Sequence, residues 1–337
     1  MICFSEGYNG LPVKIKSELR LSNLFFSEEY ERNVNSRHQK LYYIWSECYV
    51  LVARIKSQLF LKAAVLESEP YKYSEGEEEK LFLMNSMKEL KKHGVQWTIC
   101  ATTARFQDYP SDCVVVPCGN FLVDLTRTED ELWKNIHSKH RNSIRRGEKA
   151  GIEIRKGNMD LLDDYVKLSI ETYLRTSDST VGFSYYKGLV QELDDNSIIF
   201  IADKEGVPQS GGMFYYNNCI AYYLHGASVS RPEPGATNYL LWKAMMFFKE
   251  RGVKLFSFVG YHYDPEPGSK LDGIQKFKER FGGELERSYN FRYVQNFFFY
   301  RLYCFAMQVK GKKPFIKYED AIDKQLSKYS ELNRRNI

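Results

Sequence analysis

Lys278 has the sequence surroundings that most strongly favour chemistry. It lies in the segment 277–283, FKERFGG, where a basic side chain is followed by two glycines. Glycine lets the backbone approach a ligand closely, so the segment predicts a ligand held beside a cation. The alternative interpretation is a solvated lysine on a helix surface, in line with Lys276 and Arg280.

Arg141 and Arg145 lie one helical turn apart, and Lys149 continues the same face. Such a basic stripe can follow a phosphate backbone or bind a diphosphate. It can equally be a solvated face near the end of a helix, where cations stabilise the macrodipole. His137 and His140 lie three residues apart, but no carboxylate or cysteine joins them, so no metal site is predicted.

Tyr223 and His225 are two residues apart in an apolar run that is typical of a strand. Side chains at this spacing point to the same side of a strand, so we expect both on one face. Either group could take part in proton transfer or orient a reacting amine. The alternative is that each is a hydrogen-bonded structural residue.

The C-terminal half predicts the elements that must position these residues. Thr126 or Thr128 can cap a helix, with Glu129 or Glu131 completing a capping box. Short polar turns between three apolar runs predict an antiparallel meander. The predicted elements are a helix from about 128 to 151, a strand at 152–155, a helix at 161–173, strands at 198–203, 212–216 and 220–227, a helix at 238–251, a strand at 255–259, a helix at 273–280 and a strand at 284–294. This is the order expected of the GNAT fold.

The N-terminal half carries a partial echo of that order. Strands are predicted at 42–45, 50–55 and 59–65, followed by a helix at 77–93 and a strand at 95–99. Both halves place a Gly-Val pair, at 94–95 and at 252–253, between an amphipathic helix and an apolar strand. We therefore expect an α/β (α+β) protein with two GNAT-like domains, each a mixed, largely antiparallel sheet flanked by helices. The predicted limits are 1–119 for a partial or degenerate N-terminal domain, 120–310 for the C-terminal acyltransferase domain, and 311–337 for a tail that packs back on the first domain.

The overall composition is that of a globular protein. Hydrophobic residues make up 43% and charged residues 27% of the 337 positions, which argues against disorder. The 48 basic residues are balanced by 43 acidic ones and no nucleic-acid-binding motif occurs, which disfavours a protein that only binds nucleic acid. Seven cysteines occur without a CxxC motif, and neither a signal peptide nor a membrane-spanning run is evident. We expect a cytoplasmic protein with no transmembrane segment.

Three groups of segments together resemble the Fem (FemABX) family of aminoacyltransferases, which build peptidoglycan cross-bridges. They are 121–126 (FLVDLT) with 131–133 (ELW) and 139–146 (KHRNSIRR), then 271–284 (LDGIQKFKERFGGE), and finally 226–228 (GAS) with 235–242 (GATNYLLW). The resemblance extends over most of the chain. It implies two GNAT-like domains, with the acceptor in a cleft and a charged acyl donor over the second domain.

The same resemblance implies roles for individual residues. It places Lys278 beside the aminoacyl end of the donor, where the cation could bind the terminal phosphate and ribose or stabilise an oxyanion. The strand with Tyr223 and His225 borders the transfer site. The residues expected to bind the donor are Arg141, Arg145, Phe277 and Asn238. Arg175 and Tyr186 fall where the family recognises the phosphates and sugar of the acceptor; alternatively, they are a loop arginine and a core tyrosine.

Amide formation from an activated ester needs a neutral amine, an aligned carbonyl and a group that stabilises the oxyanion, but no protein nucleophile. No GxSxG elbow or recognisable cysteine nucleophile occurs, which fits a positioning mechanism. The segment 231–236, RPEPGA, lacks the spacing of an acyl-CoA pyrophosphate loop, and its prolines lack the N–H groups that such a loop supplies.

Together with these features, the resemblance to the Fem family implies an N-acyltransferase that uses aminoacyl-tRNA, with no cofactor, on an amine of a sugar-nucleotide or lipid-linked cell-wall precursor. One alternative is a GNAT enzyme that uses acyl-CoA or a carrier-linked acyl group on an amino sugar or small amine. The other is a non-catalytic tandem-GNAT binding module.

A last pattern concerns membranes. The aromatic run 297–300 (FFFY) is followed by Lys310, Lys312 and Lys313, which resembles an element that contacts a membrane surface. A lipid-linked acceptor would make such peripheral contact useful. The alternative is a final apolar helix packed against the core, with a basic linker after it.

Overall fold

The computed structural model describes residues 2–19, 24–101, 103–176, 182–193, 196–262, 265, 267–310, 318–320 and 322–327. The strands are β1 (Cys3–Glu6), β2 (Lys40–Trp45), β3 (Tyr49–Gln58), β4 (Leu61–Leu66), β5 (Tyr71–Lys72), β6 (Trp97–Cys100), β7 (Val114–Asp124), β8 (Ile152–Gly157), β9 (Ser197–Lys204), β10 (Val207–Tyr216), β11 (Ile220–Ser228), β12 (Leu255–Ser257), β13 (Tyr261–His262) and β14 (Glu284–Val294). The α-helices are α1 (Val13–Leu19), α2 (Glu28–Ser36), α3 (Glu79–Lys92), α4 (Glu129–Asn135), α5 (Ser138–Lys149), α6 (Leu162–Thr176), α7 (Phe183–Leu193), α8 (Ala236–Glu250), α9 (Lys270–Glu279) and α10 (Phe297–Lys310).

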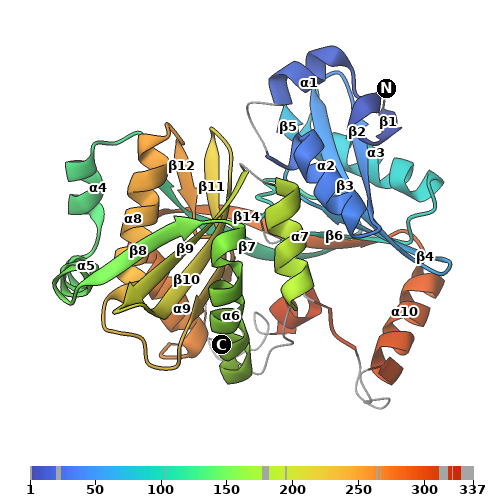
Figure 1. Cartoon of the computed structure of the whole chain (residues 1–337). Helices are drawn as coiled ribbons and strands as arrows, with labels where there is room; N and C mark the ends of the chain where they lie inside the picture. Colours follow the sequence, from blue (N-terminus) through green and yellow to red (C-terminus); the bar gives the residue numbers. More distant parts are fainter. Residues whose placement is uncertain are drawn as a thin grey trace.

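In the described part of the chain, the strands form one mixed sheet that runs through both halves (Figure 1). The order along it is β1-β2-β3-β4-β6-β14-β7-β12-β11-β10-β9-β8, with β5 on β3 and β13 on β7. Helices cover both faces, so the predicted α/β class with a largely antiparallel mixed sheet is confirmed.

The predicted echo between the halves is present in the strand pairing. In each half a helix follows three antiparallel strands, and the strand after that helix pairs in parallel with the third of them. In the N-terminal half β6 follows α3 and pairs with β4, and in the C-terminal half β12 follows α8 and pairs with β11. The two helices also end alike. Gly94 (φ 81°) and Gly252 (φ 76°) adopt the left-handed conformation. The next residues, Val95 and Val253, each donate at 3.1 Å to a carbonyl in the last helical turn.

β14 joins the two halves. It pairs with β7 from Glu284 to Arg292 and with β6 from Arg292 to Val294. Arg105 adds ion pairs to Glu69 (2.8 Å) on one side and Glu286 (2.7 Å) on the other. The predicted domain limit at 119 falls inside β7, and the division into domains stays a prediction.

The helices α1, α2, α6 and α7 share one hydrophobic core on one side of the sheet. Figure 1 shows α7 beside α2, and Asn33 of α2 donates to the carbonyl of Gly188 in α7 at 3.2 Å. A second core lies under α8. Successive residues of β10 divide between the two, because Met213 and Tyr215 belong to the first core and Phe214 to the second.

Several elements differ from the predictions. The single helix expected from about 128 to 151 is two helices, because Ile136 is extended (ψ 130°) and His137 caps α5 by accepting from the Lys139 N–H at 3.2 Å. The helices α1, α2 and α7 were not predicted. Most of the predicted tail lies outside the described residues; Asp320 and Asp323 within it each lie 2.8 Å from Arg292 of β14.

Candidate active site

The strands β11 and β12 separate near the middle of the sheet. They pair over three residues each, ending at Tyr222 and Ser257, and β11 then continues alone on that side to Ser228. The chain after β12 instead turns toward β7, where β13 pairs with it. Two separating strands expose backbone groups that a ligand can satisfy, which makes this opening the candidate site.

A strained turn follows β12. Val259 has φ 35° and Gly260 has φ 61°, both in the left-handed region that a β-branched residue rarely adopts. The Gly260 N–H donates to Asn120 Oδ1 at 2.8 Å, and the Val259 N–H donates to Ser257 Oγ at 3.3 Å. Such conformations cluster at functional sites because the surroundings must hold them in place. The sequence analysis did not identify this turn, and the only local signal is the glycine after an apolar run.

Lys278 of α9 reaches this turn. Its Nζ donates to the carbonyl of Gly260 at 2.9 Å and also to the carbonyl of Val259. Burial lowers the pKa of the Lys278 ammonium to about 8. An ammonium has three N–H donors, and in the described part of the chain only these two acceptors are bonded to it. Among the described residues the third donor has no acceptor, so it is available to a ligand in the opening.

The helix that carries Lys278 is fixed from behind by His140. The imidazole Nε2 lies 3.0 Å from the carbonyl oxygen of Phe277, and the ring contacts the rings of Phe277 and Phe281 at centroid distances of 5.0 and 4.7 Å. Burial lowers the pKa of His140, which favours the neutral ring. Phe277 is half-buried against the core under α8. Phe277 thus helps to hold Lys278 in position. Its expected contact with a donor stays a prediction.

Tyr223 and His225 do not share a face, so that expectation is wrong. Met213 pairs with His225 and Phe214 with Tyr223, which leaves Leu224 as an extra residue in β11. The extra residue of a β-bulge shifts the alternation of side chains by one. Tyr223 consequently packs on Phe214 (5.2 Å) on the α8 side, and His225 faces α7 on the other side.

On the α8 side, the Tyr223 ring lies near the residue that precedes the strained turn. Its ring lies 6.2 Å from that of Phe258, the residue before Val259. A Cβ added to Gly226 would lie 2.1 Å from the Tyr223 hydroxyl, so this glycine makes room for the phenol. Burial raises the pKa of Tyr223, which keeps the hydroxyl protonated. The structure thus brings Tyr223 and Lys278 to the same side of the opening.

On the other side of β11, His225 lies among aromatic rings. Its imidazole is 5.5 Å from the Tyr186 ring and 6.1 Å from the Tyr185 ring, and burial lowers its pKa to about 4. Tyr186 is fully buried, and its hydroxyl lies 2.9 Å from Ser169 Oγ. This position matches the core tyrosine that the sequence analysis gave as the alternative.

Arg175 is exposed at the end of α6. It donates to the carbonyl of Ser228 at 2.6 Å and contacts the Ser228 hydroxyl at 3.1 Å. It therefore ties α6 to the end of β11, close to the layer that holds His225. Its bonds within the described residues use Nε and Nη2 of the guanidinium, so its Nη1 donors can still contact an acceptor.

The two arginines of α5 have different surroundings. Arg141 donates to the carbonyls of Lys134 (2.9 Å) and Ile136 (2.5 Å), and so satisfies the C-terminal end of α4. Arg145 is exposed, with its guanidinium 5.3 Å from the centre of the Trp133 ring. Of these two arginines, Arg145 alone presents its cation to solvent, although the sequence treated them as equivalent.

Asn238 lies in the first turn of α8. Its buried Nδ2 has no hydrogen-bond partner in the described part of the chain. The α8 terminus itself is covered by α5: a Cβ on Gly235 would lie 2.2 Å from the Ser143 carbonyl oxygen and 2.6 Å from the Gly147 nitrogen. Asn238, Arg141 and Arg145 therefore lie around the contact of α5 with α8, and α5 is linked to the helix of Lys278 through the His140 contact with Phe277.

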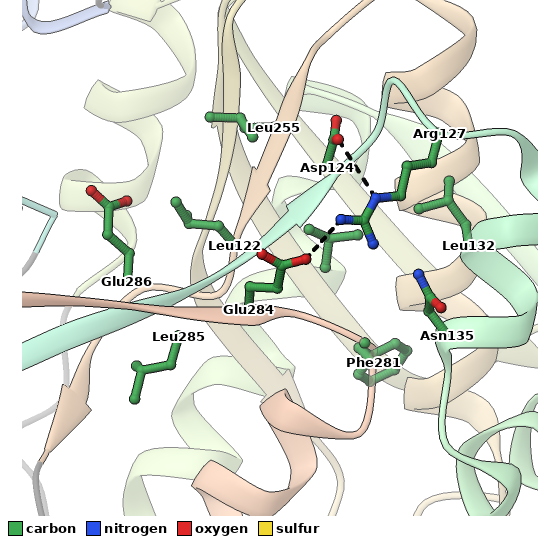
Figure 2. Close-up of a pocket in the computed structure, with 12 residues that line it drawn as sticks. Leu122, Asp124, Arg127, Leu132, Asn135, Leu255, Phe281, Glu284, Leu285 and Glu286 are labelled. Atoms are coloured by element: carbon green, nitrogen blue, oxygen red, sulfur yellow. Dashed lines mark hydrogen bonds and ion pairs between the residues drawn. The ribbon is translucent and has the colours of Figure 1, made fainter.

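The glycines after Phe281 meet protein, not a ligand, which corrects the role expected for them. A Cβ on Gly282 would lie 2.9 Å from the carbonyl oxygen of Asn135, and one on Gly283 would lie 3.2 Å from Phe121. They let β14 start against β7 and the end of α4. The hollow beside them is shown in Figure 2.

This hollow is acidic. Arg127 is held there by Glu284 at 2.7 Å and by Asp124 at 3.6 Å, while Glu286 adds a third carboxylate (Figure 2). Among the described residues that line the hollow, Arg127 is the only cation, and it is already paired with carboxylates. The surplus negative charge disfavours a phosphate-bearing donor. The opening beside Lys278 is the better candidate.

The loop before α8 uses its N–H groups internally. The Ser230 N–H donates to Glu171 Oε1 at 2.6 Å, the Glu233 N–H to Gln209 Oε1 at 3.0 Å, and the Ala236 N–H to the Glu233 carbonyl at 3.0 Å. Two prolines, Pro232 and Pro234, have no N–H. Few donors are left for a pyrophosphate, as the sequence analysis anticipated.

Comparison with known proteins gives the family. Residues 34–205, half of the chain, match the FemAB family. The chain belongs to the FemAB family, as its sequence motifs predicted. No helix in the described ranges is long and apolar enough to cross a membrane.

Two curated relatives are Lipid II:glycine glycyltransferases. That of Staphylococcus haemolyticus is 29% identical over 125 residues, which are 36% of this chain and 29% of the relative. That of Staphylococcus epidermidis (strain ATCC 35984) is 20% identical over an alignment of 256 residues, and the match covers 57% of this chain and 62% of the relative. The chain thus matches less than two thirds of the length of either relative.

Solved structures confirm the fold. The crystal structure of FemX has a TM-score of 0.68 at 15% identity and covers 90% of this chain and 99% of its own. A tandem GNAT protein from the clavulanic acid biosynthesis pathway has a TM-score of 0.52 at 9% identity and covers 88% and 99%. The predicted tandem GNAT-like architecture is therefore confirmed.

Proposed function

We propose that this chain is an N-acyltransferase of the Fem type, which transfers an aminoacyl group from aminoacyl-tRNA to an amine on a lipid-linked peptidoglycan precursor. The observation that carries the proposal is the Lys278 ammonium, bonded to the carbonyls of Val259 and Gly260 where β11 and β12 separate. Membership of the FemAB family and relatives named for glycine transfer to lipid II support the reaction class and the acceptor.

In the proposed reaction, the acceptor amine attacks the ester carbonyl of the aminoacyl group. A C–N bond forms, the tetrahedral oxyanion collapses and the C–O bond to the ribose breaks. The proton that the amine loses balances the one that the ribose hydroxyl gains. The free N–H of Lys278 would stabilise the oxyanion or the donor's ribose and phosphate, as a preorganised donor in a site of low dielectric constant. Tyr223 lies on the same side and could orient the amine.

The donor is proposed from two features. The loop before α8 has few free N–H groups, and Glu171 and Glu233 add negative charge to it, which disfavours the pyrophosphate of CoA. Arg145 and Lys149 are exposed on α5 and suit a nucleic-acid backbone. Binding of CoA in competition with charged tRNA would favour instead a GNAT enzyme that uses acyl-CoA. Donor binding without any transfer would favour a binding module.

The test is transfer of radiolabelled amino acids from a mixed pool of charged tRNAs to lipid-linked and nucleotide-linked precursors. Wild type is compared with Lys278→Ala and with Lys276→Ala as the matched control. Lys276 lies on the same helix but is half exposed and paired with Asp272 at 2.7 Å. Labelled product with wild type and Lys276→Ala, reduced at least about a hundredfold with Lys278→Ala, is the expected result. Equal rates for the two variants would remove Lys278 from the mechanism, and no product from any charged tRNA would contradict the proposed donor.

A further inference from the structure

The helix α10 is apolar on two opposite faces. On the inner face Tyr300 and Tyr303 pack on Trp97 of β6, with ring centroids 5.7 and 4.5 Å apart. This face accounts for the attachment of α10 to the sheet. It also fits the helix that the sequence analysis gave as one interpretation of the aromatic run.

The opposite face is exposed. Phe298, Leu302, Phe305 and Val309 follow at intervals of four, three and four residues, which places them in one stripe along a helix. Their exposed fractions are 72%, 36%, 59% and 53%. Isolated exposed apolar residues are common, but a continuous stripe of this kind marks a surface that binds something.

A second element brings apolar side chains to the same place. Leu59 and Phe60 form the turn between β3 and β4 and are 93% and 58% exposed. Leu59 has φ 54°, a conformation that costs a leucine about 1 kcal/mol or more, so a glycine or asparagine would suit a purely structural turn better. The Phe60 ring lies 5.9 Å from that of Phe299, so this turn and the start of α10 are neighbours, as Figure 1 shows.

Exposed cations lie beside this stripe, although Asp112 and Asp323 also line the hollow that Arg301 and Phe305 share. Arg301 and Lys310 on α10 are exposed, and neither forms an ion pair within the described residues. The sequence then continues with Lys312, Lys313 and Lys317. Aromatic and aliphatic side chains flanked by exposed cations match the interface of an anionic lipid bilayer, where rings enter the headgroup region and basic side chains meet phosphate.

We propose that this surface docks the protein on an anionic membrane. The docking surface is defined by Leu59, Phe60, Phe298, Leu302, Phe305 and Val309. A second copy of the chain is a less suitable occupant because the flanking cations would face each other. The inference is independent of the proposed acyl transfer, although a lipid-linked acceptor would give membrane docking an obvious use.

The test is co-sedimentation of the full chain with vesicles of phosphatidylcholine and phosphatidylglycerol in equal parts, and with vesicles of phosphatidylcholine alone. Wild type is expected to bind the anionic vesicles more strongly. Phe298→Ser/Phe305→Ser should weaken this binding about tenfold or more, because the variant lacks two rings that would be buried in the bilayer. Arg301→Glu/Lys310→Glu should weaken it at least about fivefold for each cation removed.

The matched control is Leu174→Ser, since Leu174 is 73% exposed at the end of α6, away from the docking surface. It should bind as wild type does. Equal binding by wild type and the double phenylalanine variant would overturn the proposal, as would failure of wild type to bind anionic vesicles. A concentration-dependent dimer without vesicles that the double variant abolishes would assign the surface to self-association instead. The measurement needs no turnover, so its outcome is separate from that of the transfer assay.

Discussion

The Nζ atom of Lys278 lies 2.9 Å from the carbonyl oxygen of Gly260. The bond connects a helix near the end of the chain to the turn where β12 leaves its parallel partner. Val259, in the same turn, holds a left-handed conformation that costs a β-branched residue roughly 1–3 kcal/mol. The lysine and the strained turn therefore support each other, and a change in either should disturb the opening between β11 and β12.

The first prediction uses the lowered pKa of Lys278. Burial brings it to about 8, so a role as a cation should weaken as pH rises through that value. Lys278→Arg keeps its charge throughout, because the arginine pKa is above about 12. We expect kcat/KM of wild type, divided by that of Lys278→Arg, to fall about tenfold per pH unit above pH 8.

The ratio removes effects of pH on the acceptor amine, which both proteins share. Transfer rates measured from about pH 6 to about pH 10 give the curve. A ratio that stays constant over that range would contradict a cationic role for Lys278. A ratio that rises with pH would point to the neutral amine as a general base.

The second prediction concerns His225. Its pKa is lowered to about 4 in the folded chain and is about 6.5 when unfolded, so between these values the unfolded chain binds more protons. Stability contributed by the neutral ring is therefore complete above about pH 6.5 and is lost as pH falls toward 4. His225→Leu should remove on the order of 3 kcal/mol of this acid sensitivity. Urea unfolding of both proteins at neutral pH and near pH 4.5 measures this acid sensitivity. If the two proteins lose the same free energy of unfolding on acidification, His225 is not its source.

The third prediction separates the arginines of α5. Arg141→Met leaves the carbonyls of Lys134 and Ile136 without their charged donor and should lower the free energy of unfolding by about 1.5–3 kcal/mol. Arg145→Met should change it by less than about 0.5 kcal/mol, because the side chain is exposed.

For donor binding, Arg145→Met should have the larger effect and Arg141→Met the smaller one. If Arg145 contacts the tRNA backbone, Arg145→Met should reduce the slope of log KM against log salt by about one. Thermal denaturation and transfer rates at several salt concentrations measure both properties. If Arg145→Met does not change the salt dependence of KM, the basic stripe of α5 is a solvated face that does not bind the donor.

The sequence predicted well those parts of the fold that depend on local signals. The joints at Gly94 and Gly252 were identified because a left-handed glycine ends a helix wherever it occurs. The helix α7 was missed, since its aromatic residues and Gly188 weaken a helical pattern, and its stability comes from contact with α2. Propensity is a weak guide where tertiary packing decides.

The site was only partly predictable for the same reason. The family resemblance pointed to Lys278, yet the left-handed Val259 that binds it has no sequence signature. The extra residue Leu224 in β11 separates Tyr223 from His225, and a period of two cannot reveal a bulge. The role of Arg141 at the end of α4 depends on the break between two helices that the sequence joined into one.

The last prediction compares two glycines within helices. A Cβ on Gly147 of α5 would lie 2.8 Å from the Gly235 carbonyl oxygen and 3.1 Å from the Tyr239 Cβ, both firmly held at the start of α8. Gly147→Ala should therefore force the helices apart and lower the free energy of unfolding by about 1–3 kcal/mol. A Cβ on Gly188 of α7 would meet no atom of the described residues within 4 Å, so Gly188→Ala should raise it by about 0.5–1 kcal/mol through better helix propensity. Urea unfolding of the two variants compares their stabilities. Because α5 and the start of α8 carry Arg145 and Asn238, Gly147→Ala should also raise KM for the donor. Equal stability of the two variants would mean that α5 packs on α8 less closely than these distances require.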